Sequence, residues 1–348
     1  MSFKKPINHH PKLETNKLGL TRRDYEGAVS TLCAGCGHDS ISAAIIESCF
    51  KLNIEAYKVA KLSGIGCSSK APAYFLEQSH GFNSVHGRMP SVATGANCAN
   101  RDLMYLGVSG DGDSASIGLG QFVHAIRRQV DMVYFVENNG TYGLTKGQYS
   151  PTSEKGKKTK STPMGSIDHP FNPLALCMGA DATFIARTMD RDPKHMREML
   201  MRSNNHKGTS LLEIYQNCNV FNDGAFFGMT DKATKMNQTL FLEHGQPLVF
   251  GENKDKGIRL DGFKPIIVSL EDCSIDDLWI HDEKDRVKAG LLTRFFDADF
   301  PRPFGVFYFE DRPTYEDALV QQIDNAIEHK GQGNLDELLK GSNTWTID

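Results

Sequence analysis

Hydrophobic and polar positions divide the middle of the chain into two apolar runs with an amphipathic stretch between them. Residues 103–108 carry the apolar pattern of a buried strand, which breaks at the Gly-Asp-Gly-Asp of residues 110–113. A second apolar run at residues 132–136 ends in the Glu-Asn-Asn-Gly of residues 137–140. Between the two runs, a helical spacing places apolar residues at Ile117, Phe122, Ala125 and Ile126. This pattern predicts two parallel strands joined by a helix, with a ligand-binding crevice at their polar carboxyl ends.

The same alternation continues on both sides of this unit. We predict further strands at residues 55–62, 82–85, 182–186 and 209–214. Helices are predicted at residues 41–52, 91–100, 173–178 and 193–206, and Asp39 or Ser40 is expected to cap the first of them. The predicted fold class is therefore α/β, with a mostly parallel sheet covered by helices on both faces.

The alternation fades after about residue 230. Residues 246–270 have the pattern of extended segments with turns, residues 302–309 that of a strand, and residues 314–329 that of a helix. We therefore expect an N-terminal arm at residues 1–30, one α/β domain at residues 31–229, and a C-terminal extension at residues 230–348. The extension is expected to pack on the domain or on a partner subunit.

Length and charge narrow the class of protein. The 348 residues suffice for one large domain plus extensions, and a net charge of −4 argues against a nucleic-acid-binding surface. No segment has the 18 or more continuous apolar residues of a membrane span. The first twenty residues lack the apolar core of a secretory signal. We expect a cytoplasmic protein that binds neither nucleic acid nor membrane, in which cysteines are thiols or metal ligands and not disulfides.

The central turns have the chemistry of a phosphate and magnesium site. Glycine allows the backbone to approach a phosphate closely, and the amides at a helix N-terminus favour anions. Asp111 and Asn139 supply hard oxygen ligands suited to Mg²⁺ that also holds phosphate oxygens, and they lie 28 residues apart, about one strand–helix–strand unit. Two ordinary tight turns are the alternative interpretation of the same residues.

The eight cysteines fall into two groups. Cys49, Cys98 and Cys177 lie within helix patterns and are expected to be small core residues, and Cys273 lies in the C-terminal part. The other four lie in turns at or near predicted strand ends, at Cys33, Cys36, Cys67 and Cys218. Four such residues could bind zinc or a [4Fe–4S] cluster, and the first two alone could form a redox pair. Spacing does not separate zinc from the cluster, because only one pair is close in the chain.

Three further segments carry candidate chemistry. Lys70 follows the Cys67 turn and could hold an anionic ligand, and His86 in the next turn could touch a cofactor. The loop at residues 145–172 is long for a compact domain, which is typical of a functional segment. Four lysines between residues 155 and 160 could form a solvated face or receive a phosphate-bearing substrate or an acidic partner. A lid, a partner clamp and a coenzyme A contact are the roles considered for this loop.

Several motifs between residues 28 and 230 resemble one family. They are CAGCGHDS, GIGCSSK, HGRMPSVATG, GVSGDGDSASIG, ENNGTYGLTKGQYSPTS, STPMG and EIYQNCNVFNDG. In this order they resemble the β subunit of 2-oxoacid:ferredoxin oxidoreductases, most closely those that use 2-oxoglutarate. The later RPFGVFYFEDRPTYE also resembles the family. The resemblance implies the thiamine-diphosphate-binding fold, specifically its diphosphate-binding domain.

The resemblance also implies a set of cofactors. Asp111, Asn139 and the main-chain carbonyl of Thr141 would hold Mg²⁺ with thiamine diphosphate. Cys33, Cys36, Cys67 and Cys218 fall on the family's cluster positions, which favours one [4Fe–4S] cluster over zinc. The residues that the resemblance places around thiamine diphosphate are Gly66, Cys67, Ser68, His86, Gly87, Gly110, Asp111, Gly112, Asp113, Asn139, Thr141, Tyr142, Gly143, Leu144 and Thr145.

The implied activity is the oxidative decarboxylation of a 2-oxoacid. The acyl group would pass to coenzyme A, and electrons would pass singly to the cluster and on to ferredoxin, with carboxylation as the reverse direction. For 2-oxoglutarate, Lys70 is expected to bind the distal carboxylate, with Arg88 as the alternative cation and Leu144 as a pocket wall. Lys70 and His86 are the candidate catalytic residues.

The chain has only the half of the site that binds the diphosphate. The glutamate that activates the aminopyrimidine lies on a separate domain in this family, so the resemblance implies an α subunit, a heterodimer and a dimer of heterodimers. Three alternatives remain at this stage. They are a pyruvate or branched-chain 2-oxoacid enzyme of the same family, a thiamine-diphosphate decarboxylase or lipoamide-linked dehydrogenase subunit, and a non-catalytic zinc-binding subunit.

Overall fold

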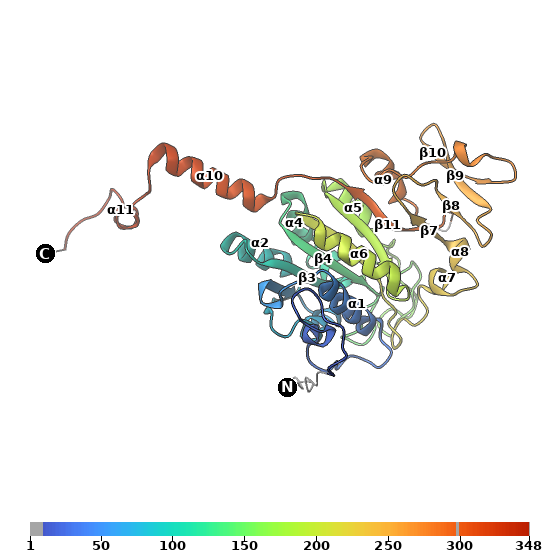
Figure 1. Cartoon of the computed structure of the whole chain (residues 1–348), viewed down its shortest axis with the longest axis horizontal. Coiled ribbons are helices and arrows are strands. Elements are labelled where there is room, and N and C mark those ends of the chain that lie inside the picture. Colours follow the sequence, from blue (N-terminus) through green and yellow to red (C-terminus); the bar gives the residue numbers. More distant parts are fainter. Residues whose placement is uncertain (1–9, 297–298, 348) are drawn as a thin grey trace.

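The computed structural model describes residues 10–296 and 299–347, and the first nine residues of the expected N-terminal arm lie outside this range. A large sheet of eight strands forms the centre of the molecule (Figure 1), in the order β2-β1-β3-β4-β6-β5-β11-β7. Every neighbouring pair is parallel except β5 and β11, which are antiparallel. The predicted mostly parallel sheet is therefore confirmed.

The strands of the large sheet are β1 (Val59–Ser63), β2 (His80–Asn83), β3 (Met104–Gly110), β4 (Met132–Asn138), β5 (Phe184–Met189), β6 (Thr209–Tyr215), β7 (Thr239–Leu242) and β11 (Arg302–Phe309). A small antiparallel sheet holds β8 (Val249–Phe250), β9 (Lys256–Asp261) and β10 (Lys264–Ser269). The α-helices are α1 (Gly37–Lys51), α2 (Met89–Ala99), α3 (Asp111–Ala115), α4 (Leu119–Arg128), α5 (Pro173–Gly179), α6 (Pro193–Asn205), α7 (Phe227–Thr230), α8 (Lys235–Gln238), α9 (Arg286–Leu292), α10 (Tyr315–Lys330) and α11 (Leu335–Lys340). The 3₁₀ helices are η1 (Arg22–Tyr25), η2 (Ala56–Lys58), η3 (Ser68–Tyr74) and η4 (Ile275–Asp277).

Alternate residues of the central strands enter two separate cores, one on each face of the sheet. In β4, Tyr134 packs in a core with side chains of α2, α4 and α5, whereas its neighbour Phe135 packs in a core with side chains of α1 and α6. All seven residues of β4 are buried because both faces are covered. The continuous apolar run in the sequence has this physical origin, and the predicted helices on both faces are confirmed.

The carboxyl ends of β1, β3, β4 and β6 lie at one edge of the sheet. Gly110 pairs with Glu137 across β3 and β4, and Asn138 pairs with Tyr215 across β4 and β6. The turns that follow these strands carry Cys67, Asp111, Asn139 and Cys218. Parallel pairing thus brings together residues that are up to about 150 positions apart in the sequence.

Two expected helix boundaries differ in the structure. The helix expected over residues 117–126 begins at Leu119, and α3 is a separate short helix before it. Ile117, which the pattern placed in the core, is 58% exposed. The break has a steric reason, since a Cβ atom on Gly118 would lie 2.8 Å from the Cα atom of Gly87, so the neighbouring turn packs directly on the backbone there. The first long helix starts at Gly37, with Cys36 as its N-cap and not Asp39 or Ser40.

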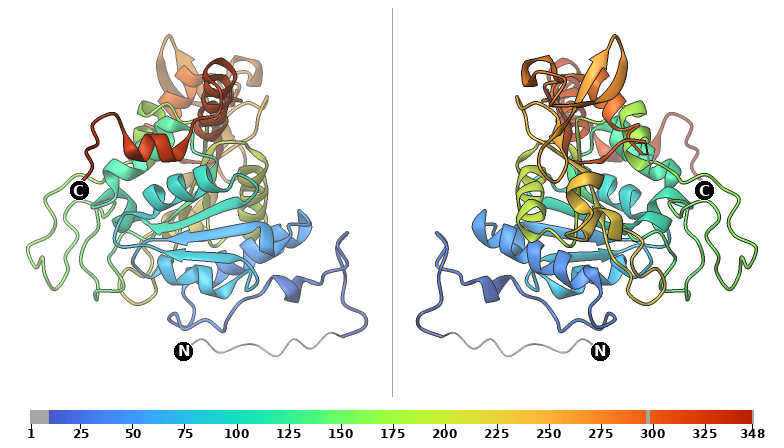
Figure 2. Two further views of the ribbon diagram at one scale, coloured as in Figure 1. Left: turned by 90° about the vertical axis from the view of Figure 1, so that its left-hand side faces the viewer. Right: turned by 90° about the vertical axis from the view of Figure 1, so that its right-hand side faces the viewer.

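The C-terminal third adds two strands to the large sheet. β11 lies between β5 and β7, and the small sheet stands beside them (Figure 1). α10 and α11 then run away from the body of the molecule, so that most residues after 320 are exposed. The loop at residues 145–172, light green in Figure 2, stands out at one side of the sheet. Within the described residues, no helix is long and apolar enough to cross a membrane.

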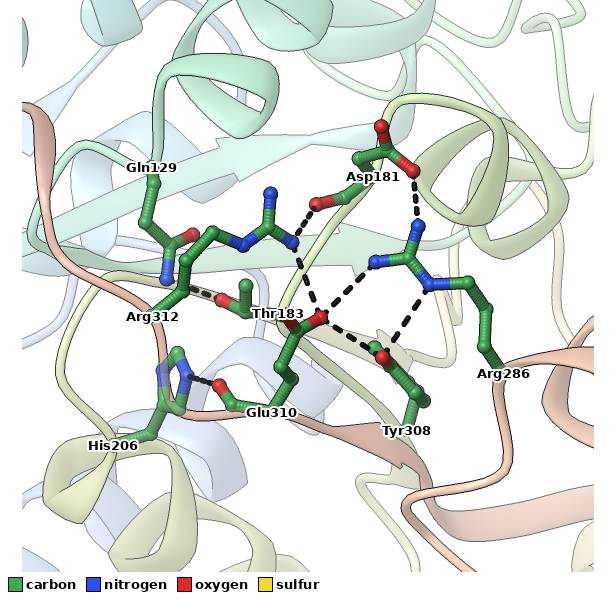
Figure 3. A network of polar contacts seen from close by, with 8 residues as sticks. All are labelled: Gln129, Asp181, Thr183, His206, Arg286, Tyr308, Glu310 and Arg312. Atoms are coloured by element: carbon green, nitrogen blue, oxygen red, sulfur yellow. Dashed lines mark hydrogen bonds and ion pairs between the residues drawn. The ribbon is translucent and has the colours of Figure 1, made fainter.

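A polar network fixes the point where the chain leaves β11 (Figure 3). Oε2 of Glu310 accepts hydrogen bonds from Tyr308 Oη at 2.8 Å and from Arg286 Nη2 at 3.0 Å. Arg312 Nη2 also lies 3.3 Å from this oxygen and donates to the carbonyl of Asp181 at 2.8 Å. These contacts join β11, α9 and the turn before β5, which anchors the start of the C-terminal arm to the domain.

Candidate active site

Asp111 is a buried carboxylate at the end of β3. Its Oδ2 accepts hydrogen bonds from Ser150 Oγ at 2.5 Å and Thr152 Oγ1 at 2.6 Å, and its Oδ1 lies 3.4 Å from the main-chain nitrogen of Asn139. Burial raises the pKa of Asp111, and the hydrogen bonds from Ser150 and Thr152 oppose the shift. No Lys, Arg or His among the described residues forms an ion pair with Asp111. A divalent cation would supply the missing positive charge.

The Asn-Asn turn after β4 presents further oxygen atoms beside Asp111. Oδ1 of Asn139 accepts a hydrogen bond from the main-chain nitrogen of Thr141 at 3.1 Å, which closes the turn. The main-chain oxygen of Thr141 accepts no hydrogen bond from a described residue, so it is available to a ligand. Oxygen atoms from a carboxylate, an amide and a carbonyl form the donor set that Mg²⁺ prefers. The three predicted metal ligands therefore lie on adjacent turns.

Asn138, the first asparagine of the pair, links the turn to neighbouring segments through hydrogen bonds. Asn138 Nδ2 donates to Glu213 Oε1 at 2.8 Å, and its Oδ1 accepts from Thr152 Oγ1 at 2.9 Å. Glu213 in turn forms a fully buried ion pair with Arg187, whose Nε lies 2.6 Å from Oε2. This ion pair and its hydrogen bonds hold β4, β5 and β6 in register beneath the site.

Asp113 joins three turns of the same edge. Its Oδ1 accepts from the main-chain nitrogens of Gly87 at 2.8 Å and Ile65 at 3.3 Å, and its Oδ2 accepts from Ser109 Oγ at 2.9 Å. The turns after β1, β2 and β3 are therefore bound to one carboxylate. This places Asp113, which the sequence assigned to cofactor binding, in a position that shapes the turns around the cofactor.

The four turn cysteines come together at the same edge. Cys36 is the N-cap of α1, Cys67 precedes η3, and Cys218 follows β6. A Cβ atom on Gly143 would lie 3.4 Å from the sulfur of Cys67 and 3.7 Å from that of Cys218, so both sulfur atoms lie close to the backbone of this one glycine. Burial, with smaller contributions from the nearby Cys218, Cys67 and Cys33, raises the pKa of Cys36 to about 12.

The spacing of these cysteines bears on the kind of group they could hold. Among the described residues, no three His, Cys, Asp or Glu side chains are arranged to hold a single metal ion. A tetrahedral zinc site needs its sulfur atoms within about 4 Å of one another. A [4Fe–4S] cluster binds one thiolate at each of four separate iron atoms and needs wider spacing. The described side chains therefore form no ready-made site for a single zinc ion.

A buried histidine and a buried glutamate lie between the cysteines and the strand end. His38 Nδ1 lies 3.1 Å from the sulfur of Cys36, and its Nε2 lies 3.0 Å from Ser68 Oγ and 3.2 Å from Glu137 Oε2. Burial lowers the pKa of His38 to about 4 and raises that of Glu137 to about 8. Both side chains are therefore neutral near pH 7. Sequence analysis did not single out either residue for chemistry.

The raised pKa of Glu137 gives a testable pH dependence. Between pH 6.5 and 8 the native Glu137 stays protonated while the unfolded one is ionised, so unfolding releases a proton and stability falls as pH rises. Burial lowers the pKa of His38 from 6.5 to about 4, so His38 opposes this trend only near pH 6.5, where the unfolded imidazole is half protonated, and it does so equally in the unmodified chain and in the variant. We expect Glu137→Gln to gain stability relative to the unmodified chain by up to about 2 kcal/mol between pH 6.5 and 8. Thermal unfolding across this range measures it.

The exposed Glu154→Gln is the control for this experiment, since its side chain is largely in solvent. The stability of this variant should equal that of the unmodified chain at every pH. A pH dependence in Glu137→Gln that equals that of the unmodified chain would show that Glu137 is ionised throughout and would contradict the assigned protonation.

Lys70 lines a cavity of about 450 Å³ between the N-terminal segment, β1, β2 and η3. A second lysine of this cavity, Lys61, donates to the carbonyls of Pro72, Phe75 and Leu76 and is fully engaged. Lys70 is exposed, and its ammonium forms no hydrogen bond or ion pair with a described residue. It is therefore available to an anionic ligand at the rim of the cavity.

The remaining predicted residues lie on the surrounding turns. His86 is exposed beside Gly87, and Leu144 is 51% exposed in the turn that follows the Asn-Asn pair. The guanidinium of Arg88 donates to the carbonyl of Ile117 at 3.1 Å and to Gln121 Oε1 at 2.7 Å. Arg88 is thus held against the start of α4, which makes it a weaker candidate for an anion than Lys70.

Known families match this fold and site. A model described as "Thiamine pyrophosphate enzyme, C-terminal TPP binding domain" matches residues 64–214. The 2-oxoglutarate oxidoreductase subunit KorB of Mycobacterium tuberculosis is 42% identical over 321 residues, 91% of this chain and 85% of that protein. Subunit beta of 2-oxoacid:ferredoxin oxidoreductase 1 of Aeropyrum pernix is 39% identical, over 84% of this chain and 82% of its own length.

The chain belongs to the β-subunit family of 2-oxoacid:ferredoxin oxidoreductases. The resemblance found in the sequence is therefore confirmed. A solved structure, "2-oxoglutarate:ferredoxin oxidoreductase from Magnetococcus marinus with 2-oxoglutarate, coenzyme A and succinyl-CoA bound", matches with a TM-score of 0.75 and 29% identity. The match covers 97% of this β subunit and 100% of that chain, so it includes the C-terminal extension.

Some residues that build the site were missed in the sequence of this β subunit. Ser150 and Thr152, which hold Asp111, lie in the long loop and were treated only as part of it. Gln216 also escaped notice, although its Oε1 accepts from Asn139 Nδ2 at 2.9 Å. For Ser150 and Thr152, the only signal in the sequence was the cluster of Ser and Thr residues around Pro151. Nothing in the local pattern marks Gln216, because its role depends on the pairing of β4 with β6.

Proposed function

We propose that this β subunit, with an α subunit, converts 2-oxoglutarate, coenzyme A and oxidised ferredoxin into succinyl-CoA, CO₂ and reduced ferredoxin, and that the reaction is reversible. The observation that carries the proposal is the meeting of two donor sets at one edge of the sheet. Oxygen donors on the turns after β3 and β4 lie beside cysteines on the turns after β1 and β6. A thiamine-diphosphate enzyme that passes electrons to a cluster needs both sets close together.

The oxygen donors fit a magnesium diphosphate. Asp111, Asn139 and the carbonyl of Thr141 would hold Mg²⁺, and Asp111 is a buried carboxylate without a cation partner among the described residues. Thiamine diphosphate, when bound, supplies a carbanion that adds to the keto carbon and an electron sink for decarboxylation. This chain would orient the diphosphate through these ligands and through Ser150 and Thr152, which fix the carboxylate of Asp111.

The sulfur donors fit one [4Fe–4S] cluster. Cys67 and Cys218 lie together beside Gly143, and Cys36 and Cys33 lie close enough to interact electrostatically with them. The cluster would accept electrons one at a time and pass them to ferredoxin. The resemblance of the four cysteine positions to those of the family supports a cluster over a single zinc ion.

The proposed assembly follows from what this chain supplies. The family name of its relatives includes the word "beta", which supports an α subunit that would carry the pyrimidine half of the site. We propose a heterodimer that pairs into a heterotetramer, located in the cytoplasm.

We keep the division into an arm at residues 1–30, a domain at 31–229 and an extension at 230–348, in which the extension completes the sheet through β7 and β11.

Lys70 is our candidate for substrate selection. We expect Lys70→Met to lower kcat/KM for 2-oxoglutarate by about 30-fold, or about 2 kcal/mol, because a charge-assisted contact to the distal carboxylate is lost. Pyruvate lacks that carboxylate, so its kcat/KM should change little. Steady-state kinetics with both substrates measures the ratio. Lys51→Met, which removes an exposed lysine on α1, is the control and should leave the ratio unchanged. An unchanged ratio in Lys70→Met would exclude Lys70 from the substrate site.

The proposed function is tested by coenzyme A-dependent reduction of a viologen dye by the anaerobically purified complex, across a panel of 2-oxoacids. We expect a strong preference for 2-oxoglutarate and no turnover by the isolated β subunit. A preference for pyruvate or a branched-chain 2-oxoacid would contradict 2-oxoglutarate as the substrate and leave the family assignment unchanged. Reduction by the isolated chain would contradict the need for an α subunit.

A further inference from the structure

We propose that His38 and Gln216 form a two-donor cradle for the thiolate of Cys36, which sets the reduction potential of the cluster. The inference rests on the proposed [4Fe–4S] cluster and concerns residues that would not touch its iron atoms. His38 Nδ1 lies 3.1 Å from the sulfur of Cys36, and Gln216 Nε2 lies 3.5 Å from it. Both distances lie within the range of hydrogen bonds to sulfur.

The histidine has one tautomer that suits this role. A thiolate bound to iron carries no proton and can only accept a hydrogen bond, so Nδ1 must be the nitrogen that donates. Nε2 then needs a donor, and Ser68 Oγ at 3.0 Å supplies one. Glu137 lies on the same side of the ring, with Oε2 at 3.2 Å from Nε2. His38 is 1% exposed and Ser68 2%, so no solvent competes for these contacts.

Glu137 is neither a proposed metal ligand nor a proposed cluster ligand. Its side chain is 0% exposed, and its polar neighbours are the ring of His38, 3.2 Å from Oε2, and the hydroxyl of Ser68. A buried carboxyl group is costly unless such neighbours pair with it. Its position at the end of β4, beside the ring of His38, holds the ring between Cys36 and the strand end that carries Asn139.

Gln216 connects the cradle to the metal ligands. Its Oε1 accepts from Asn139 Nδ2 at 2.9 Å while its Nε2 points to the sulfur of Cys36. One amide therefore joins a proposed magnesium ligand to a proposed cluster ligand. Gln216 and His38 approach the same sulfur from β6 and α1, which makes Cys36 the cysteine with two side-chain donors among the described residues.

Hydrogen bonds to cluster sulfur atoms stabilise the reduced, more negative state and raise the reduction potential. Removing the His38 donor should therefore lower the potential. The test uses a pair of variants in the α–β complex. The amide nitrogen of asparagine can replace Nδ1, so His38→Asn keeps the donor to Cys36. The longer glutamine places its amide near Nε2, so His38→Gln keeps the contact with Ser68 and loses the donor to Cys36.

The experiment is a redox titration of the cluster followed by EPR. We expect His38→Gln to lower the equilibrium constant for one-electron reduction about tenfold, which corresponds to about −59 mV, and His38→Asn to stay close to the unmodified complex. The control is His195→Gln, a half-buried histidine whose Nδ1 lies 2.8 Å from Thr188 Oγ1 on another part of the sheet. It should leave the potential unchanged.

A second measurement detects the contact directly, and a small yield of the variant is enough for the comparison. In the unmodified complex labelled with ¹⁵N-histidine, pulsed EPR of the reduced cluster should show a nitrogen coupling that disappears in His38→Asn. Equal potentials in His38→Gln and the unmodified complex, or no ¹⁵N coupling, would overturn the cradle while leaving the proposed function intact. The absence of any iron–sulfur signal in the unmodified complex would overturn both.

Discussion

Replacing Asp111 by alanine is expected to weaken the binding of thiamine diphosphate by about 100-fold or more in the presence of Mg²⁺. Asp111 is the one carboxylate among the three proposed metal ligands, and it is held by Ser150 and Thr152 with no cation partner among the described residues. Losing a ligating charge should cost more than losing a residue that only orients a ligand, which typically costs 10–100-fold. Calorimetric titration of the complex with thiamine diphosphate at fixed Mg²⁺ measures the change.

The matched control is Asp131→Asn. Asp131 is half-buried, and its Oδ1 accepts a hydrogen bond from the main-chain nitrogen of Gly208 at 2.8 Å. It immediately precedes β4, at the opposite edge of the sheet from Asn139. This variant should lose some stability and bind the cofactor normally. Equal cofactor affinity in Asp111→Ala and the unmodified complex would remove Asp111 from the metal site.

Replacing Cys67 by alanine is expected to abolish ferredoxin reduction. A [4Fe–4S] cluster needs a thiolate at each iron atom, and Cys67 lies with Cys218 beside Gly143. The loss should appear as missing iron and acid-labile sulfide and as a fall of about 10³-fold or more in electron transfer to ferredoxin, because one-electron acceptors need the cluster. Thiamine diphosphate should still bind, since the oxygen donors lie on other turns.

Cys49→Ala is the control for this experiment. Cys49 is a fully buried cysteine of α1 that packs in the core, so its replacement changes packing and removes no cluster ligand. Iron content should stay at the level of the unmodified complex. Normal iron content and normal ferredoxin reduction in Cys67→Ala would contradict the cluster assignment.

The sequence was sufficient to predict the central strands and the edge that carries the site. β4 is buried on both faces, so its apolar run has no competing interpretation. The carboxyl end of β4 could then be predicted from the polar residues that come after the apolar run. Cys67 and Cys218 could be assigned to the same edge because both follow predicted strands. Their closeness to Cys36 was implied only by the family resemblance.

The contacts that complete the site could not be predicted, because they join residues far apart in the chain. Ser150 reaches Asp111 across 39 positions, and Gln216 reaches Cys36 across 180. Neither has a local pattern that differs from an ordinary loop or strand end. His38 appeared only within the CAGCGHDS motif, and its role emerges from the contacts of α1 with Glu137 at the end of β4 and Ser68 at the start of η3.

The break between α3 and α4 shows a different limit. The apolar spacing at residues 117–126 continues the helical pattern, and nothing in it marks an interruption. The interruption comes from the turn at Gly87, which packs on the backbone of Gly118 and pushes Ile117 outward. Packing between segments thus overrode the local preference. Likewise, the pattern predicted β11 as a strand, whereas its place between β5 and β7 depends on tertiary pairing.

The central claim is that this one chain holds both the diphosphate of the cofactor and the cluster that takes its electrons. Anomalous diffraction at the iron edge, from crystals of the anaerobically purified complex, tests it most directly. We predict an iron peak bounded by Cys33, Cys36, Cys67 and Cys218, and diphosphate density with a metal at Asp111 and Asn139. A peak at the zinc edge instead of iron, or a cofactor bound away from Asp111, would contradict the account.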